Sequence, residues 1–175
     1  MNKKLKLWEL NRPTVEEFKQ QEKFPIVVVL DNIRSLANVG TFFRTADAFN
    51  VSKIILGGIT AAPPHREIQK TALGATESID WEHHSDLEDL LTSYKKEGYS
   101  IYAVEQAEKT TLLQHVHPKI NNKHVLIFGN EVDGVQQKYV DLADTVIEIP
   151  QYGTKHSLNV SVCAGVVLWE FVRNF

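Results

Sequence analysis

Short apolar runs recur along the chain, and they most constrain how it can fold. The first run follows Pro25 and is rich in β-branched residues, as expected for a strand covered on both faces of a parallel sheet. Four similar runs follow at intervals, and each is long enough for one strand. The five runs are Ile26–Leu30, Val51–Leu56, Ser100–Val104, His124–Phe128 and Thr145–Ile149.

Segments of helical character separate these runs. Ser35–Phe49 repeats apolar residues at helical spacing, and Ser85–Glu88 matches a capping box before an apolar stripe that Gly98 can close. Shorter helices are expected over Glu67–Thr71 and Gln136–Leu142. Because strands and helices alternate throughout, the sequence predicts an α/β domain with a mainly parallel sheet.

The composition is that of a globular, single-domain protein. Its 175 residues are enough to bury a core without disulfides or metal, and 43% of them are hydrophobic. No apolar run is long enough to span a bilayer, so we expect a cytoplasmic protein without a membrane partner. The formal net charge of −3 argues against phosphate binding over the whole surface. The single cysteine, Cys163, lies among apolar residues and is expected to be a buried, inert thiol.

A loop bounded by Gly129 and Gly134 follows the fourth run, where the carboxyl end of a parallel strand delivers residues to a ligand site. The two glycines would allow close approach of a ligand to the backbone, and Glu131 would lie at the site. The loop is not a phosphate-binding P-loop, because Val135 stands where Lys and Ser or Thr are needed, and the chain contains no GxGxxG. A tight turn with an incidental carboxylate is the alternative interpretation.

The C-terminal stretch brings a strand end and a helix start together. Pro150 stops the fifth run, and Ser157, Leu158 and Asn159 open a long apolar helix. Unpaired backbone N–H groups and short side-chain acceptors at this helix start would form a cradle for a small ligand. An ordinary core helix is the alternative, since apolar helical periodicity usually indicates packing.

The histidines raise the question of a metal site. Neither His83 and His84 nor His115 and His117 come with Cys or carboxylate neighbours at the usual spacings, so we expect no metal. His83 and His84 are expected in a solvated loop before the capping box. His156 precedes a serine, but no GxSxG elbow surrounds it, which argues against a hydrolase triad.

Asn38 and Arg44 are polar residues within an otherwise apolar helical segment. Their separation of six positions is more than one helical turn and less than two, so the side chains need not share a helix face. A loop around Asn38 and Gly40 would free the two side chains to converge.

Three blocks of the sequence carry more information together than separately. They are Asn38-Val39-Gly40 with Arg44-Thr45-Ala46, Leu126–Glu131 with Gly134, and Ile149-Pro150 with Ser157–Val162 and Gly165. In this order and spacing they closely resemble the three motifs of the SpoU/TrmH branch of the SPOUT RNA methyltransferases. The resemblance runs from about Ile26 to Phe171, so we expect a catalytic domain over residues 25–175 and a basic N-terminal arm or helix over residues 1–24.

The resemblance implies a doubly wound sheet whose C-terminal part is tucked through a loop as a deep trefoil knot. It implies that S-adenosylmethionine binds in the knot, held largely by backbone groups of the loops. The residues so assigned are Gly129, Asn130, Ile149, Leu158 and Asn159. It also implies a homodimer in which first-motif residues of one subunit lie beside the cofactor of the other.

The reaction that the resemblance implies is methyl transfer to a ribose 2′-hydroxyl of tRNA or rRNA. Alignment of the nucleophile can supply roughly 7–11 kcal/mol of the barrier without a metal. The resemblance implies that Arg44 activates the hydroxyl. Because a guanidinium hardly ever loses a proton, we expect Arg44 instead to clamp the neighbouring phosphate and stabilise the developing alkoxide. Phosphate and water are candidate proton acceptors, and which group accepts the proton stays open. Asn38 and Glu131 would orient Arg44 or the ribose, and Ser157 and Asn159 would shape the pocket.

Two other functions remain open on the sequence alone. One is a catalytically idle RNA-binding module of the same fold, which has no physical need for the polar set of Asn38, Arg44, Glu131 and Asn159. The other is a knotted enzyme that methylates a base, against which the motif match favours ribose.

Overall fold

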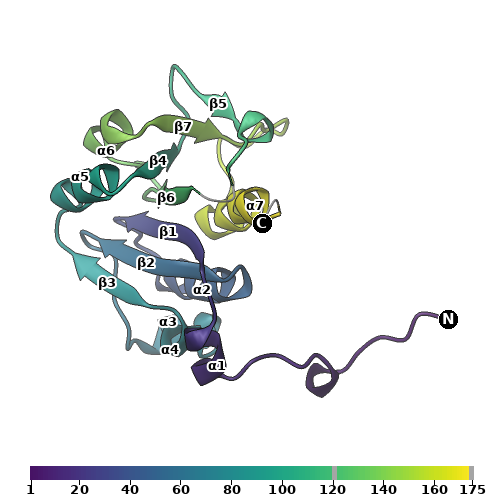
Figure 1. Ribbon diagram of the computed structural model, residues 1–175. Helices are drawn as coiled ribbons and strands as arrows, with labels where there is room; N and C mark the ends of the chain where they lie inside the picture. The colour runs from purple at the N-terminus through teal and green to yellow at the C-terminus, as the bar shows by residue number, and fades with distance from the viewer. Residues whose placement is uncertain (120–121, 174–175) are drawn as a thin grey trace.

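The computed structural model describes residues 1–119 and 122–173. Its framework is one seven-stranded sheet in the order β3-β2-β1-β6-β4-β7-β5, in which every pair of neighbouring strands is parallel (Figure 1). The strands are β1 Phe24–Asp31, β2 Val51–Gly57, β3 Trp81–His84, β4 Tyr99–Val104, β5 Thr111–Leu112, β6 Lys123–Phe128 and β7 Thr145–Glu148. The parallel sheet and the five strands expected from the apolar runs are confirmed.

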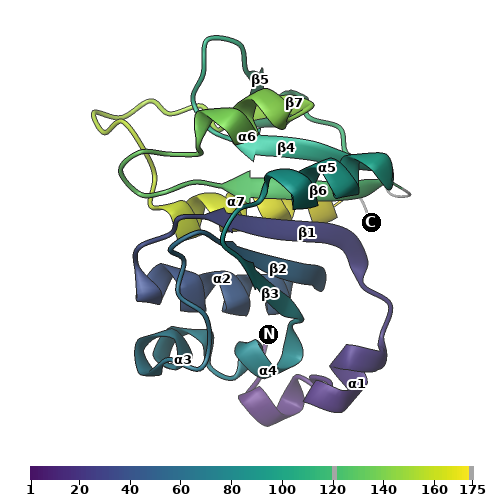
Figure 2. The same cartoon turned by 90° about the vertical axis from the view of Figure 1, so that its left-hand side faces the viewer.

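Helices cover both faces of this sheet, so the α/β domain is doubly wound (Figure 1, Figure 2). One face carries α2, α3, α4 and α7, and the other carries α5 and α6. The helices are α1 Val15–Gln20, α2 Leu36–Ala48, α3 Arg66–Ala72, α4 Ala75–Ser78, α5 Glu88–Lys96, α6 Gln137–Leu142 and α7 Val160–Val172, with short 3-10 turns η1 Leu7–Glu9 and η2 Leu113–His115. No helix in the described ranges is long and apolar enough to cross a membrane.

Strand β1 divides the core into two parts. Val28 and Leu30 pack in the cluster that α2 and α7 contribute to, whereas Val27 and Val29 pack in the cluster on the α5 side. All four side chains are at most 2% exposed. Burial on both faces explains why the sequence of β1 is a continuous apolar run without polar alternation.

The first part of α2 is fixed by a close crossing with α3. A Cβ atom on Gly40 would lie 2.3 Å from the carbonyl oxygen of Ile68, so only glycine allows this approach. The hydroxyl of Thr71 donates to the Ala37 carbonyl oxygen at 3.0 Å across the same crossing. The loop suggested around Asn38 and Gly40 is therefore wrong, because both residues lie inside α2 and are held there by helix packing.

Two further expectations about the region before α5 are corrected. His83 and His84 lie in the edge strand β3, which pairs with β2, and not in a solvated loop. Their strand lacks an apolar run because its side chains are partly or fully exposed. The capping box at Ser85 does not form: Asp86 Oδ1 accepts the Glu88 N–H at 2.8 Å, one residue later than expected.

The N-terminal segment consists of an extended part and a docked helix. The chain before α1 runs away from the body of the molecule in Figure 1. Helix α1 begins at a Thr14–Glu17 capping box, and its Phe18 is buried in the core. The side chain of Asn50 donates to the Glu22 carbonyl oxygen at 2.8 Å and ties the following residues to the domain.

Candidate functional site

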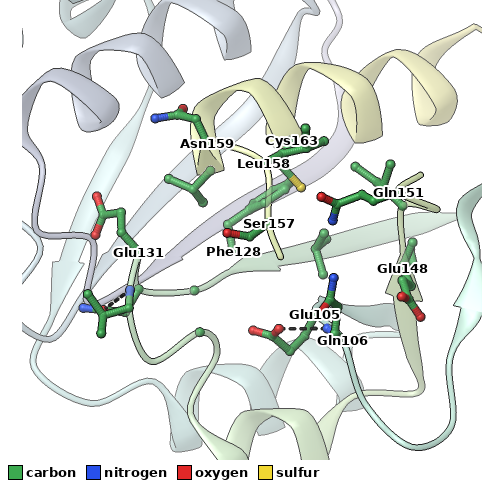
Figure 3. A pocket seen from close by; sticks show the side chains of 18 residues that line it. Glu105, Gln106, Phe128, Glu131, Glu148, Gln151, Ser157, Leu158, Asn159 and Cys163 are labelled. Carbon is green, nitrogen blue, oxygen red and sulfur yellow. Dashed lines mark hydrogen bonds between the residues drawn. The ribbon is translucent and has the colours of Figure 1, made fainter. Parts of the chain in front are cut away.

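A cavity of about 340 Å³ lies at the carboxyl ends of β4, β6 and β7 (Figure 3). Its walls come from the ends of these strands, the loops that follow them and the first turn of α7. The volume lies within the range of about 300–1,000 Å³ that is usual for small-molecule sites. The lining residues are Val104, Glu105, Gln106, Phe128–Val132, Gly134, Ile147, Glu148, Ile149, Gln151, Ser157–Val160 and Cys163.

The cavity brings together most of the residues singled out in the sequence. All five residues that the resemblance assigns to the cofactor line it, namely Gly129, Asn130, Ile149, Leu158 and Asn159. Glu131 and Ser157 line it as well. Asn38 lies behind this wall and is bonded to it, whereas Arg44 is elsewhere.

Asn38 links the three motif blocks by hydrogen bonds. Its Nδ2 donates to Glu131 Oε1 at 3.0 Å, and its Oδ1 accepts from Asn159 Nδ2 at 3.2 Å. Asn159 Oδ1 in turn accepts the Ser161 N–H at 2.9 Å and caps α7. The first turn of α2, the loop after β6 and the start of α7 are therefore held in one arrangement.

Glu131 is held as an anion. Its carboxylate accepts the backbone N–H groups of Arg34 at 2.9 Å and Ser35 at 3.0 Å, in addition to the Asn38 amide. Burial raises the pKa of Glu131, but these donors outweigh burial and hold the pKa below its ordinary value. A carboxylate of this kind orients neighbouring donors and is not a proton donor at neutral pH.

The loop after β6 is folded tightly upon itself. Asn130 Oδ1 accepts the N–H groups of Val132 at 2.8 Å and Asp133 at 3.1 Å, and Asn130 Nδ2 donates to the Asn32 carbonyl oxygen at 2.7 Å. Gly134 has a φ of +71°, in the left-handed region that favours glycine. The loop therefore presents its backbone to the cavity in a fixed conformation.

Arg44 lies outside the cavity of its own chain. It is on an exposed position of α2, and within residues 1–119 and 122–173 no hydrogen bond or ion pair holds its guanidinium. Asn38 and Arg44 therefore do not converge, because both lie on one continuous helix and six positions place their side chains on different faces.

Several lining residues were not singled out as site residues in the sequence, and Glu105 is the most prominent. Glu105 and Gln106 follow β4, so the strand-end rule that selected Glu131 could also have selected them. Gln106 Nε2 donates to the His156 carbonyl oxygen at 3.0 Å and joins the β4 loop to the loop before α7.

Burial, together with the charge of Glu105, raises the pKa of Cys163 to about 12, which agrees with the expected inert thiol.

The described part of the chain offers no cluster of three or more His, Cys, Asp or Glu side chains that could hold a metal ion. The polar atoms around the cavity are mainly backbone groups, amides and carboxylates. Such groups suit an organic ligand with an apolar body and a few polar attachment points.

Comparison with known proteins identifies the family. The model of the SpoU rRNA Methylase family matches residues 25–169. The chain belongs to the SpoU rRNA Methylase family.

Two curated relatives of this SpoU family chain act on different RNAs. The chain is 30% identical to the 23S rRNA (guanosine-2'-O-)-methyltransferase RlmB of Vibrio parahaemolyticus, over 94% of this chain and 66% of that protein. It is also 30% identical to the tRNA (guanosine(18)-2'-O)-methyltransferase of Thermus thermophilus, over 94% of this chain and 83% of that protein. The chain thus spans just under two thirds of the length of the Vibrio RlmB protein.

Two solved structures share the fold of this SpoU family chain. The TrmH/SpoU tRNA modifying enzyme of A. aeolicus superposes with a TM-score of 0.80 at 28% identity, over 91% of this chain and 79% of that chain. The AdoMet-bound rRNA methyltransferase of Sinorhizobium meliloti superposes with a TM-score of 0.82 at 29% identity, over 90% of this chain and 60% of that chain. These likenesses confirm the family resemblance carried by the three sequence blocks.

Proposed function

We propose that the protein is an S-adenosylmethionine-dependent RNA methyltransferase that acts on a ribose 2′-hydroxyl of tRNA or rRNA. The observation that carries the proposal is the meeting of all three family motifs at one cavity, joined through the Glu131–Asn38–Asn159 hydrogen bonds. The names of the Vibrio and Thermus relatives, both ribose 2′-O-methyltransferases, support the same reaction.

The cavity at the ends of β4, β6 and β7 is the proposed S-adenosylmethionine site. Ile149 and Leu158 offer apolar surface for an adenine ring, and the backbone of the Gly129 loop offers donors and acceptors. The AdoMet-bound Sinorhizobium relative has the same fold, which supports this assignment. When bound, the cofactor supplies an electrophilic methyl group, and no metal takes part in the proposed reaction.

The chain's own residues have separate roles in this proposal. Arg44 holds the phosphate next to the target ribose through its two-pronged guanidinium and stabilises negative charge on the 2′ oxygen. The proton of the 2′-hydroxyl passes to phosphate or water. A guanidinium keeps its own proton and cannot accept another, and the lowered pKa of Glu131 makes its carboxylate a poor proton acceptor near neutral pH. Asn38, Glu131, Ser157 and Asn159 keep the substrate side of the cavity in shape.

A homodimer is part of the proposal, because α7 exposes an apolar stripe. Val162, Val166 and Trp169 are 55%, 41% and 59% exposed on successive turns. Nothing lies within 4 Å of a Cβ built on Gly165 of the same helix, so another backbone can approach there. Arg44 lies on helix α2, which packs beside α7. In the proposed dimer Arg44 serves the cavity of the partner subunit, as the family resemblance implies.

We also propose the trefoil knot, the division of the chain and the location. The knot is supported by the family fold and by the path of the chain, which leaves β7 near one sheet edge and returns to place α7 beside α2. The proposed catalytic domain covers residues 25–175, of which 120–121 and 174–175 lie outside the described residues, and residues 1–24 form the N-terminal arm and helix. The proposed location is the cytoplasm.

The proposed function is tested by mapping methyl groups on RNA from cells with and without the protein. The expected result is the loss of one or more 2′-O-methyl groups from tRNA or rRNA. Loss of base methylation alone would assign the protein to the base-methylating class, and an unchanged methylation map would indicate the idle RNA-binding module.

A further inference from the structure

The charged side chains that line the cavity all carry negative charge. Three carboxylates, Glu105, Glu131 and Glu148, are among its lining residues, and none of the described residues that line it is Lys, Arg or His. Formal charge on the whole chain is only −3, so this excess is local. A partly enclosed cavity with carboxylate walls favours a cation over a neutral molecule of the same shape.

Of these three carboxylates, Glu105 is fixed where β4 ends. Its Oε2 accepts the Val135 N–H at 2.9 Å, and its Oε1 accepts the Gln106 N–H at 2.8 Å. A Cβ on Gly134 would lie 2.1 Å from Glu105 Oε2, so the glycine makes room for this carboxylate. The charge of Glu105 is therefore held in a set position against the loop after β6.

The charge of Glu105 also acts within the cavity. In the view of Figure 3, Glu105 lies on the lower wall and Cys163 on the upper wall. After burial, the charge of Glu105 is the second cause of the raised pKa of Cys163. The other two carboxylates are engaged elsewhere: Glu131 is bonded to Arg34, Ser35 and Asn38, and Glu148 to the Thr110 hydroxyl.

We propose that Glu105 makes the cavity select the charged methyl donor over the neutral product of the reaction. S-adenosylmethionine carries a sulfonium, whereas S-adenosylhomocysteine, left after methyl transfer, carries a neutral sulfide. Both molecules keep an α-ammonium and an α-carboxylate, so Glu105 attracts S-adenosylmethionine through one positive charge more than the product. The spent cofactor is therefore released more readily. This inference rests on the proposed function and adds a specificity-determining residue to it.

The test is calorimetric binding of three ligands to the full chain and to Glu105→Gln. The ligands are S-adenosylmethionine, S-adenosylhomocysteine and sinefungin, which carries an amine in place of the sulfonium. Glutamine keeps an acceptor for the Val135 N–H, so the thermal unfolding midpoint without ligand serves as the check on folding. The matched control is Glu108→Gln, an exposed position in the same loop that does not line the cavity.

Glu105→Gln is expected to weaken the binding of S-adenosylmethionine and of sinefungin about tenfold. It is expected to weaken the binding of S-adenosylhomocysteine by less than about twofold. Glu108→Gln is expected to change none of the three affinities. Equal weakening of all three ligands, or of none, would overturn the role of Glu105 and leave the proposed function standing. If the unaltered chain bound neither S-adenosylmethionine nor S-adenosylhomocysteine, the proposed function would fall and this inference with it.

Discussion

Asn38 donates a hydrogen bond of 3.0 Å to Glu131, a residue 93 positions away in the sequence. The bond connects the first turn of α2 to the loop after β6, and the other end of the same amide accepts from Asn159 at the start of α7. Asn38 itself is 9% exposed. One buried amide therefore holds together three segments that form or support the cavity.

Replacement of Asn38 by alanine is expected to destabilise the fold. The variant leaves Glu131 with one donor fewer and Asn159 Nδ2 without its acceptor, which costs about 1–3 kcal/mol of unfolding free energy. Urea unfolding measures the change. Asn38→Asp should cost more at neutral pH, because it places a second carboxylate beside the anionic Glu131. Equal stability of Asn38→Ala and the unaltered chain would show that the bond contributes nothing.

The pKa of Glu131 predicts how stability depends on pH. Its folded-state pKa lies below the ordinary value of 4.5, so its charged form stabilises the fold above that pH. This contribution is lost as the pH falls below 4.5 and through the folded-state pKa. Between about pH 7 and about pH 3, the unfolding free energy should fall less for Glu131→Gln than for the unaltered chain. Parallel losses in the two proteins would contradict the lowered pKa.

Much of the site was predictable because its residues follow strands. Gly129, Asn130 and Glu131 come directly after an apolar run, and Leu158 and Asn159 open an apolar helix, so local pattern places them at one sheet edge. The strands β3 and β5 were missed, since exposed or two-residue strands at the sheet edges have no apolar run. They are defined by pairing with β2 and β7, which the sequence of the strands themselves does not encode.

The Asn38–Glu131 contact could not be predicted for a related reason. It depends on how β6 is placed beside β1, which brings residues of distant segments to neighbouring strand ends. The position of Arg44 was predictable only as far as its helix. Spacing alone left its direction relative to Asn38 open, and the continuous helix α2 sets it.

Arg44→Ala is expected to reduce methyl transfer at least about a hundredfold, with Arg44→Lys less impaired but still defective. Lysine keeps the charge and loses the fork that holds a phosphate. The affinity for S-adenosylmethionine should stay nearly unchanged, because Arg44 does not line the cavity of its own chain. Methyl-transfer rates and calorimetric binding of S-adenosylmethionine check this prediction. The arginine control is Arg173→Ala, because Arg173 forms an ion pair with Glu170 at the end of α7. Unimpaired transfer by Arg44→Ala would remove Arg44 from the mechanism.

Mixing of two inactive variants tests whether Arg44 serves the partner subunit. Leu158→Trp fills the cavity of its own subunit and keeps Arg44, whereas Arg44→Ala keeps the cavity and lacks the arginine. If the site is shared, each mixed dimer has one intact site, and random mixing restores about a quarter of the activity of the unaltered dimer.

No recovery in mixtures shown by light scattering to contain dimers would place Arg44 and its cavity in the same subunit. A fully active monomer at micromolar concentration would contradict both the dimer and the shared site. Val166→Glu, on the exposed stripe of α7, is expected to weaken the dimer and the activity together.

The chemical position of the transferred methyl group decides whether the protein methylates ribose. RNA is incubated with the protein and radioactive S-adenosylmethionine, hydrolysed in alkali and separated by size. A 2′-O-methylated ribose cannot attack the adjacent phosphate, so we expect the label to appear in alkali-resistant dinucleotides. Label found only in mononucleotides, or no transfer to any tRNA or rRNA, would contradict ribose methylation by this protein.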